Sequence, residues 1–148
     1  MSDTIFPFID VPEAASGTES SSDLPLYREY AYDYDNNRFL LQDGKPYLIE
    51  GNDALRVWIY FALRSTRFRY TAFTADYGSE IDNLIGQPFD GDITALELRR
   101  YITEALMINP YIVELSGWQS NREGSHIHMS FDCRTIYGTM AANYDYKE

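Results

Sequence analysis

The 148-residue sequence has one cysteine, two histidines and no long apolar run, and each scarcity argues against a class of protein. A single cysteine, Cys133, cannot form an internal disulfide framework or a cysteine-rich metal site. No apolar stretch approaches the roughly 18–20 residues that a membrane-spanning helix needs. The acidic N-terminus, MSDTIFPFID, also lacks the basic residues of a signal peptide. We therefore expect the chain to fold in a reducing cytosol.

Basic residues are also scarce, with 12 Lys and Arg against 23 Asp and Glu and a formal net charge of -11. A surface of this sign repels phosphate backbones and anionic lipid, which argues against nucleic acid and membranes as partners. Such a bias fits a basic protein partner, although solubility alone also accounts for it.

The first 26 residues contain no Lys or Arg and include the Ser-, Gly- and Glu-rich run EAASGTESSSD. This composition cannot bury itself, so it predicts a flexible, extended, acidic N-terminal arm over 1–26. The arm has an apolar tip, for which two outcomes stay open: it binds a neighbouring protein, or it folds back on its own domain. The tip residues are Ile5, Phe6, Phe8 and Ile9.

Residues 27–148 show the periodicities of one folded domain. Alternating tyrosines at 30–34, with turn signals at 36–37 and 43–44, predict a small antiparallel meander. The run 51–66 predicts a central helix with Asn52 as its N-cap, and 67–73 a strand.

The stretch DYGSEIDNLIG, residues 76–86, then predicts a second helix. Gly78 supplies the turn, Ser79 the N-cap and Gly86 the stop. A third helix follows, with Thr94 and Glu97 at the spacing of a capping box, and ends at Asn109-Pro110.

Two strands, 111–118 and 126–137, follow this helix and are joined by a hairpin turn over 119–125. In the second strand, every other residue from Ile127 to Cys133 is apolar, and the residues between them, from His126 to Arg134, are polar. The Tyr-rich tail YGTMAANYDYKE is either a docking element or a frayed end. We therefore predict a single α+β domain with a mostly antiparallel sheet and about three helices.

The candidate chemical groups favour structural roles. Asp76, Glu80 and Asp82 could form a glycosidase pair, but residues 80 and 82 diverge on a helix, and caps are the better interpretation. His126 and His128 share a strand face with Asp132, which is too few ligands for a convincing metal site. We therefore predict no catalytic residue, no metal and no cofactor.

Four arginines lie close together in the sequence, within a chain that is otherwise acidic. They lack a glycine-rich phosphate loop, so neutralising the acidic N-terminal half or an acidic partner is the favoured interpretation. Cys133 has no adjacent base and is interpreted as a core residue. The four arginines are Arg56, Arg64, Arg67 and Arg69.

From Gly51 to Gly117, the order and spacing of several short motifs resemble the XkdS-type phage tail proteins. They also resemble the wider gene-25-like baseplate wedge family of contractile tails and type VI secretion systems. An apolar helix, a Thr/Arg turn, a Tyr-Gly-Ser motif, a helix ending near glycine and a further helix follow one another. The landmarks are Thr66-Arg67, Tyr77-Gly78-Ser79, Leu84-Ile85-Gly86 and 100–106.

The resemblance implies a structural wedge subunit that helps wedge assembly and initiates sheath polymerisation. It implies wedge, sheath or tube-proximal proteins as partners, and multiple copies in a symmetric ring. It also implies a place in the virion tail baseplate, or a phage-tail-like particle, assembled in the bacterial host cytoplasm. Family members carry Glu-Pro-Arg where this chain has Asn109-Pro110-Tyr111, which is thereby a candidate partner-binding segment.

Two alternatives remain open at this point. One is a tail-associated cell-wall hydrolase, because some wedge-family members are labelled lysozyme-like. The other is an acidic adaptor protein unrelated to phage tails. In the assembly interpretation, the terminal strands would bind partners through their exposed edges.

Overall fold

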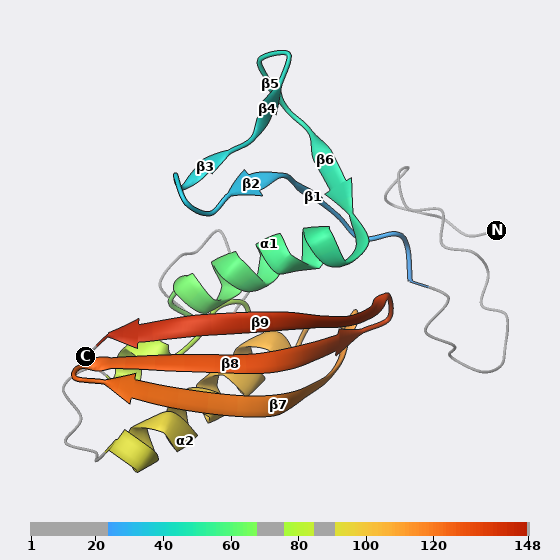
Figure 1. Ribbon diagram of the computed structural model, residues 1–148. Helices are drawn as coiled ribbons and strands as arrows, with labels where there is room; N and C mark the ends of the chain where they lie inside the picture. The colour runs from blue at the N-terminus through green and yellow to red at the C-terminus, as the bar shows by residue number, and fades with distance from the viewer. Residues whose placement is uncertain (1–23, 68–75, 85–90, 148) are drawn as a thin grey trace, which may run out of the picture.

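A computed structural model describes residues 24–67, 76–84 and 91–147 of the chain. Residues 112–147 form one antiparallel sheet of three long strands, with β8 in the centre (Figure 1). Alternate β8 side chains are buried, which confirms the predicted alternation: Ile127, Met129, Phe131 and Cys133 are at most 2% exposed. The strands are β7 (Ile112–Glu123), β8 (His126–Thr135) and β9 (Gly138–Lys147).

Two α-helices, α1 (Gly51–Arg64) and α2 (Gly91–Leu106), pack against each other and against this sheet. Helix α1 contacts β9, and α2 contacts β7 and β8. Their apolar faces and the buried face of β8 form one core, centred on large side chains that are almost completely excluded from solvent. These include Leu55, Leu63, Leu98, Ile102 and Phe131. The α+β class and the single compact domain are therefore confirmed.

The prediction of about three helices is wrong in one detail. Within the described residues, the second predicted helix is a single 3-10 turn, η2 (Ile81–Leu84), so two α-helices and one short turn are present. A turn of four residues suffices to bury Ile81 and Leu84 against the core. The predicted stop at Gly86 and most of the predicted strand 67–73 lie outside the described residues.

Both helix starts differ from the predicted caps. Helix α1 begins at Gly51 and its N-cap position is Glu50, so Asn52 lies inside the first turn. The Asn52 side chain instead accepts a hydrogen bond from the Thr135 hydroxyl, which ties α1 to the β8–β9 turn. Helix α2 begins at Gly91, so Thr94 is already helical. Glu97 is not part of a capping box but pairs with Arg100 at 2.6 Å.

The residues before α1 form a small lobe of short strands rather than the predicted simple meander. The first strand pairs with the last, and two hairpins branch from this stem (Figure 1). Ala31 joins them, because its amide donates to the Tyr47 carbonyl and its carbonyl accepts from the Leu40 amide. The strands are β1 (Arg28–Tyr30), β2 (Tyr32–Asp33), β3 (Arg38–Phe39), β4 (Leu41–Gln42), β5 (Lys45–Pro46) and β6 (Leu48–Glu50).

The end of the chain also departs from prediction. Strand β7 continues to Glu123, so the predicted turn over 119–125 shrinks to Gly124 and Ser125. The Tyr-rich tail is not frayed: it forms β9, whose ten residues all pair with β8. Met140 and Tyr146 on this strand are buried in the core, which explains why the tail is ordered.

Among the described residues, no helix is both long enough and apolar enough to span a bilayer.

Candidate functional site

The Tyr77-Gly78-Ser79 segment is bonded to the C-terminal end of α1. The Ser79 amide donates to the Ser65 carbonyl at 2.8 Å, and the Arg67 amide donates to the Ser79 carbonyl at 2.9 Å. The Ser79 hydroxyl donates to the Leu63 carbonyl at 3.0 Å. The predicted role of this hydroxyl as the N-cap of the following helix is therefore wrong, because it donates to a carbonyl of the preceding helix instead.

Gly78 makes this close approach possible. Its φ is +101°, and a Cβ at this position would lie only 2.7 Å from the Ser65 carbonyl oxygen. Tyr77 extends the junction by packing edge-on against Trp58 of α1, with ring centroids 6.1 Å apart. Burial raises the pKa of the Tyr77 hydroxyl. The segment thus holds the chain after α1 against that helix.

The carboxylates near this junction have structural partners. Glu80 forms an ion pair with Arg67 at 3.9 Å. Asp82 accepts a hydrogen bond from the Thr66 hydroxyl, and Asp76 is exposed. A general acid needs a carboxyl in an apolar site, where burial raises its pKa. Asp76 is instead a surface acid, Glu80 is one member of an ion pair, and Asp82 is a hydrogen-bond acceptor.

The two histidines lie on the exposed face of β8. His128 pairs with Asp145 on β9, directly across the ladder. Asp132 is four residues farther along the strand, about 13 Å away by strand geometry. Among the described side chains, no group of three His, Cys, Asp or Glu residues could hold a metal ion.

Cys133 is completely buried on the opposite face of β8. Burial raises the pKa of its thiol to about 11, although Arg56 partly opposes the shift. A thiol of this kind stays protonated near neutral pH and is a poor nucleophile.

Asn109-Pro110-Tyr111 forms a tight corner between α2 and β7. The Asn109 side-chain oxygen accepts from the Tyr111 amide at 2.9 Å, and the Asn109 carbonyl accepts from the Ile112 amide. The Tyr111 hydroxyl donates to the Pro25 carbonyl, and its ring stacks on Tyr137 with centroids 6.3 Å apart. Asn109 and Tyr111 are buried, so both side chains act inside the domain, and only Pro110 is exposed.

Large apolar side chains surround this corner at the surface. Each is at least 37% exposed, although nearby apolar residues of the same segments are buried. We call this group, together with Pro110, the Pro110 surface. Its signal in the sequence is the apolar pair Met107-Ile108, which lies beyond the buried stripe of α2. The other members are Leu26, Val113 and Tyr137.

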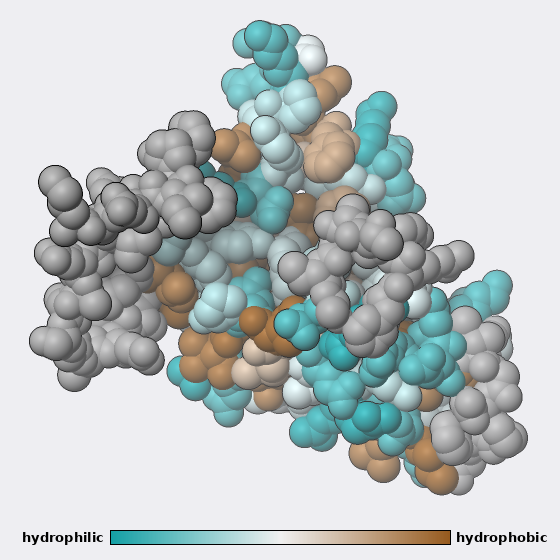
Figure 2. Space-filling model, turned by 180° about the vertical axis from the view of Figure 1, so that it is seen from behind, coloured by the Kyte–Doolittle hydropathy of each residue, from teal (hydrophilic) through white to brown (hydrophobic). Residues whose placement is uncertain are grey.

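The small lobe exposes a second apolar group. Figure 2 shows brown apolar side chains beneath the hydrophilic tip of the projecting lobe. Aromatic rings connect the base of the lobe to α1: Tyr32 packs on Phe61 with centroids 4.8 Å apart, and Tyr34 on Tyr60 at 4.9 Å. The exposed apolar residues of the lobe are Tyr30, Tyr34, Phe39, Leu40, Leu41 and Leu48.

The sheet has two edge strands with different surfaces. Strand β7 is irregular, with register shifts between Ile112 and Glu114 and between Ser116 and Gln119. Such bulges discourage pairing with another strand. Strand β9 pairs with β8 without a shift, and on its outer side no described strand pairs with it. A regular edge of this length presents backbone donors and acceptors to a partner strand, although the Ala141 carbonyl already accepts a hydrogen bond from Arg56.

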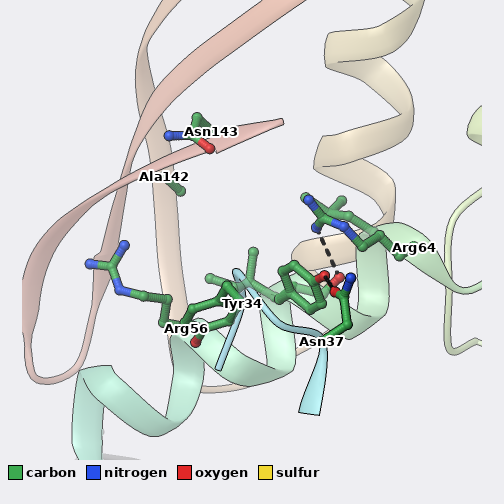
Figure 3. A pocket seen from close by; sticks show the side chains of 9 residues that line it. Tyr34, Asn37, Arg56, Arg64, Ala142 and Asn143 are labelled. Carbon is green, nitrogen blue, oxygen red and sulfur yellow. Dashed lines mark hydrogen bonds between the residues drawn. The ribbon is translucent and has the colours of Figure 1, made fainter. Parts of the chain in front are cut away.

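The four arginines that lie close together in the sequence do not share one site. Arg56 and Arg64 lie at opposite ends of a cleft beside β9 (Figure 3), whereas Arg67 pairs with Glu80. Arg69 lies outside the described residues, as do the apolar tip residues Ile5, Phe6, Phe8 and Ile9 of the N-terminal arm.

Residues 28–138 match the sequence pattern of a protein family that is described as the contractile injection system sheath initiator. The match includes the lobe, both helices, the Tyr77-Gly78-Ser79 junction and the sheet up to the start of β9. The chain belongs to the sheath initiator family. It is 28% identical over 112 residues to the phage-like element PBSX protein XkdS of Bacillus subtilis (strain 168), an alignment that covers 75% of this chain and 76% of XkdS. The resemblance to XkdS-type contractile tail proteins is thereby confirmed.

Proposed function

We propose that this sheath initiator is a structural subunit of the baseplate wedge, on which the first sheath subunits of a contractile tail assemble. Membership of the sheath initiator family carries the proposal, because it covers three quarters of the chain and names this step. The proposed place is the tail baseplate of a virion or phage-tail-like particle, assembled in the host cytoplasm. Several copies would be arranged in a symmetric ring, with wedge subunits and sheath or tube-proximal proteins as neighbours.

The outer edge of β9 is the proposed sheath-binding element. Arg56 donates from Nη1 to the Ala141 carbonyl at 3.0 Å, which identifies the side of β9 that faces away from β8. Backbone groups alternate along a strand, so the Asn143 amide also faces away from β8. An added sheath strand would use these groups, while Arg56 occupies one carbonyl until it is displaced.

The Pro110 surface is the proposed contact with the wedge. Exposed apolar side chains that surround a rigid corner provide the apolar centre typical of a specific interface. Asn109 and Tyr111 act indirectly, by fixing the backbone on which Pro110 and its neighbours lie. The arm tip formed by Ile5, Phe6, Phe8 and Ile9 is the second proposed wedge contact.

A purely structural role is supported by the partners of the candidate acids. Glu80 pairs with Arg67 and Asp82 accepts from Thr66, so both have partners unrelated to a substrate. The histidine pair and Cys133 add no group suited to hydrolysis. We therefore propose assembly, rather than cell-wall hydrolysis, as the activity of this chain.

The variant Asn143→Pro tests the proposed edge. Proline removes the outward amide but leaves the β8–β9 ladder intact, because an edge strand tolerates proline where its amide faces solvent. Asn143→Thr is the matched control, since it changes the side chain and keeps the amide. Each variant replaces the native protein in the producing strain, and the released particles are examined by electron microscopy.

We expect Asn143→Pro to yield baseplates that contain the variant but carry little or no sheath, and Asn143→Thr to yield normal sheaths. Normal sheaths on Asn143→Pro particles would exclude β9 as the sheath-binding edge. Loss of the variant from the baseplate would place β9 in the wedge contact instead, which also contradicts the proposal.

A further inference from the structure

A cavity of about 440 Å³ lies between α1, the turn that links β2 to β3, and β9. Figure 3 shows Arg56 and Arg64 at its two ends, Tyr34 and Asn37 on one side, and Asn143 of β9 on the other. We call it the arginine cleft. Its lining combines two guanidinium groups with tyrosine rings and amides, and contains no acidic residue, although the protein carries a net charge of -11.

Neither arginine of the cleft pairs with a carboxylate in the part of the chain that the structure describes. Arg56 donates to the Ala141 carbonyl, and Arg64 donates to the Tyr60 carbonyl at 3.2 Å while lying 3.8 Å above the Tyr60 ring. A guanidinium has five N–H donors, so each keeps donors for a further acceptor. Other arginines of this acidic chain do pair with carboxylates: Arg28, Arg38, Arg67, Arg100 and Arg134.

We propose that the arginine cleft binds the acidic N-terminal segment of the same chain. Asp10 and Glu13 would pair with the two guanidinium groups, and Phe8 would pack on the tyrosine rings of the cleft. Residues 1–23 carry five acidic side chains and no basic one, so this segment is strongly acidic along its whole length. Paired arginines beside aromatic rings suit such a segment, because they bind carboxylates in a defined geometry.

The spacing of the two acids fits the spacing of the two arginines. Arg56 and Arg64 are eight residues apart on α1, which corresponds to about 12 Å along the helix axis. Asp10 and Glu13 are three residues apart, or about 10 Å in an extended chain. Pro12 between them favours such an extended backbone. One extended segment can therefore reach both ends of the cleft, in either direction.

The connection is also long enough. The Gly51 amide donates to the Tyr27 carbonyl at 3.0 Å, so the described chain starts beside the first turn of α1. From there to Arg64 is about 20 Å along the helix. The 14 residue steps from Glu13 to Tyr27 can span more than twice that distance, about 46 Å at full extension. Binding within one chain therefore needs no strain in the linking segment.

Hydrogen–deuterium exchange of the full chain tests this inference, with mass spectrometry of peptides that cover residues 4–16. In dilute, low-salt solution we expect these amides to exchange severalfold more slowly in the native chain than in the double variant Arg56→Gln/Arg64→Gln. About 0.5 M salt should abolish the difference, because it screens exposed ion pairs. Arg134→Gln is the matched control: it removes an exposed arginine from the other face of the sheet and should leave the protection unchanged.

Charge reversal gives the second test. Arg56→Glu/Arg64→Glu should remove the protection, and adding Asp10→Arg/Glu13→Arg should restore it, whichever acid pairs with which arginine. Thermal unfolding of each variant checks that the domain is folded. Equal exchange in the native chain and the glutamine double variant would overturn the proposal. A loss of protection in Arg134→Gln as large as that in the glutamine double variant would also overturn it. Protection that grows with protein concentration would also overturn it, by identifying a second copy as the donor of the segment.

This inference concerns the free chain and does not rest on the proposed role in a tail. A chain that protects its N-terminal segment but fails to support sheath assembly would refute only the proposed function.

Discussion

Gly78 and Ser65 approach so closely that no side chain fits between them: a Cβ on Gly78 would lie 2.7 Å from the Ser65 carbonyl oxygen and 3.0 Å from the Arg67 nitrogen. The contact fixes the segment after α1 against the end of that helix. Together with the backbone bonds of Ser79, it is the local reason that the Tyr-Gly-Ser motif lies where it does.

Gly78→Ala should therefore lower the free energy of unfolding by about 3 kcal/mol, because it adds a backbone clash to an unfavourable positive φ. Gly124→Ala is the control. Its φ is +60° but nothing lies within 4 Å of the added Cβ, so the expected cost is only about 1–2 kcal/mol. Denaturant unfolding of both variants measures the difference. Equal losses would show that the close contact with Ser65 contributes nothing.

The Tyr111 hydroxyl links the corner after α2 to the start of the described chain through the Pro25 carbonyl. Tyr111→Phe removes this bond and should cost about 1 kcal/mol of stability. It should also increase amide exchange near residues 25–27 more than elsewhere. Tyr101→Phe is the control and should change neither quantity, because Tyr101 is half-buried on α2 and its hydroxyl makes no hydrogen bond to the described residues. Unchanged exchange near Pro25 in Tyr111→Phe would contradict the role assigned to this hydroxyl.

The buried thiol of Cys133 predicts a dependence of stability on alkaline pH. Its pKa in the folded chain is about 11 against an ordinary value of 9.0, so the unfolded chain loses its proton first as pH rises. The stability that the neutral thiol contributes is complete below about pH 9 and declines between about pH 9 and pH 11, by about 3 kcal/mol in total.

Denaturant unfolding of the native chain and of Cys133→Ala across this pH range isolates the effect. The tyrosines are common to both chains, so the difference in stability between them should shrink as pH rises. A difference that stays constant from pH 8 to pH 11 would show that the thiol does not titrate as its burial implies.

The Pro110 surface predicts a defect in assembly without a defect in folding. Ile108 is 43% exposed and Leu96, on the outer face of α2, is 64% exposed. Ile108→Asp should change the free energy of unfolding by less than about 1 kcal/mol but should prevent incorporation into particles. Leu96→Asp should be incorporated normally. Immunoblots of purified particles measure both, and normal incorporation of Ile108→Asp would remove this surface from the wedge contact.

Periodic patterns in the sequence predicted the elements whose burial is decided locally. The strand from His126 was predictable because a two-residue period leaves one face apolar, and the central helix because its apolar residues surround most of its circumference. Strand β9 had the same signal, with Met140, Ala142, Tyr144 and Tyr146 at alternate positions, but the many tyrosines and charged residues obscured it.

The predictions that were wrong concern side chains whose partners lie far away in the sequence. Asn52 has the composition of a helix cap, yet its side chain bonds to Thr135, 83 residues later. The Ser79 hydroxyl likewise donates to the Leu63 carbonyl rather than capping the turn that follows it. The arginine cleft could not be recognised from spacing either, because β9 and the lobe complete it from opposite ends of the chain.

The most direct test of the central claim is the removal of the protein from its producing strain, followed by electron microscopy of the released particles. We predict that the released particles lack assembled sheaths. Full sheathed tails should return on complementation with the native chain, and equally with Asp76→Asn/Glu80→Gln, which removes both candidate catalytic acids. Intact, correctly sheathed particles in the absence of the protein would contradict a role in sheath initiation. Failure of the double variant alone, despite normal folding and incorporation, would restore the hydrolase alternative.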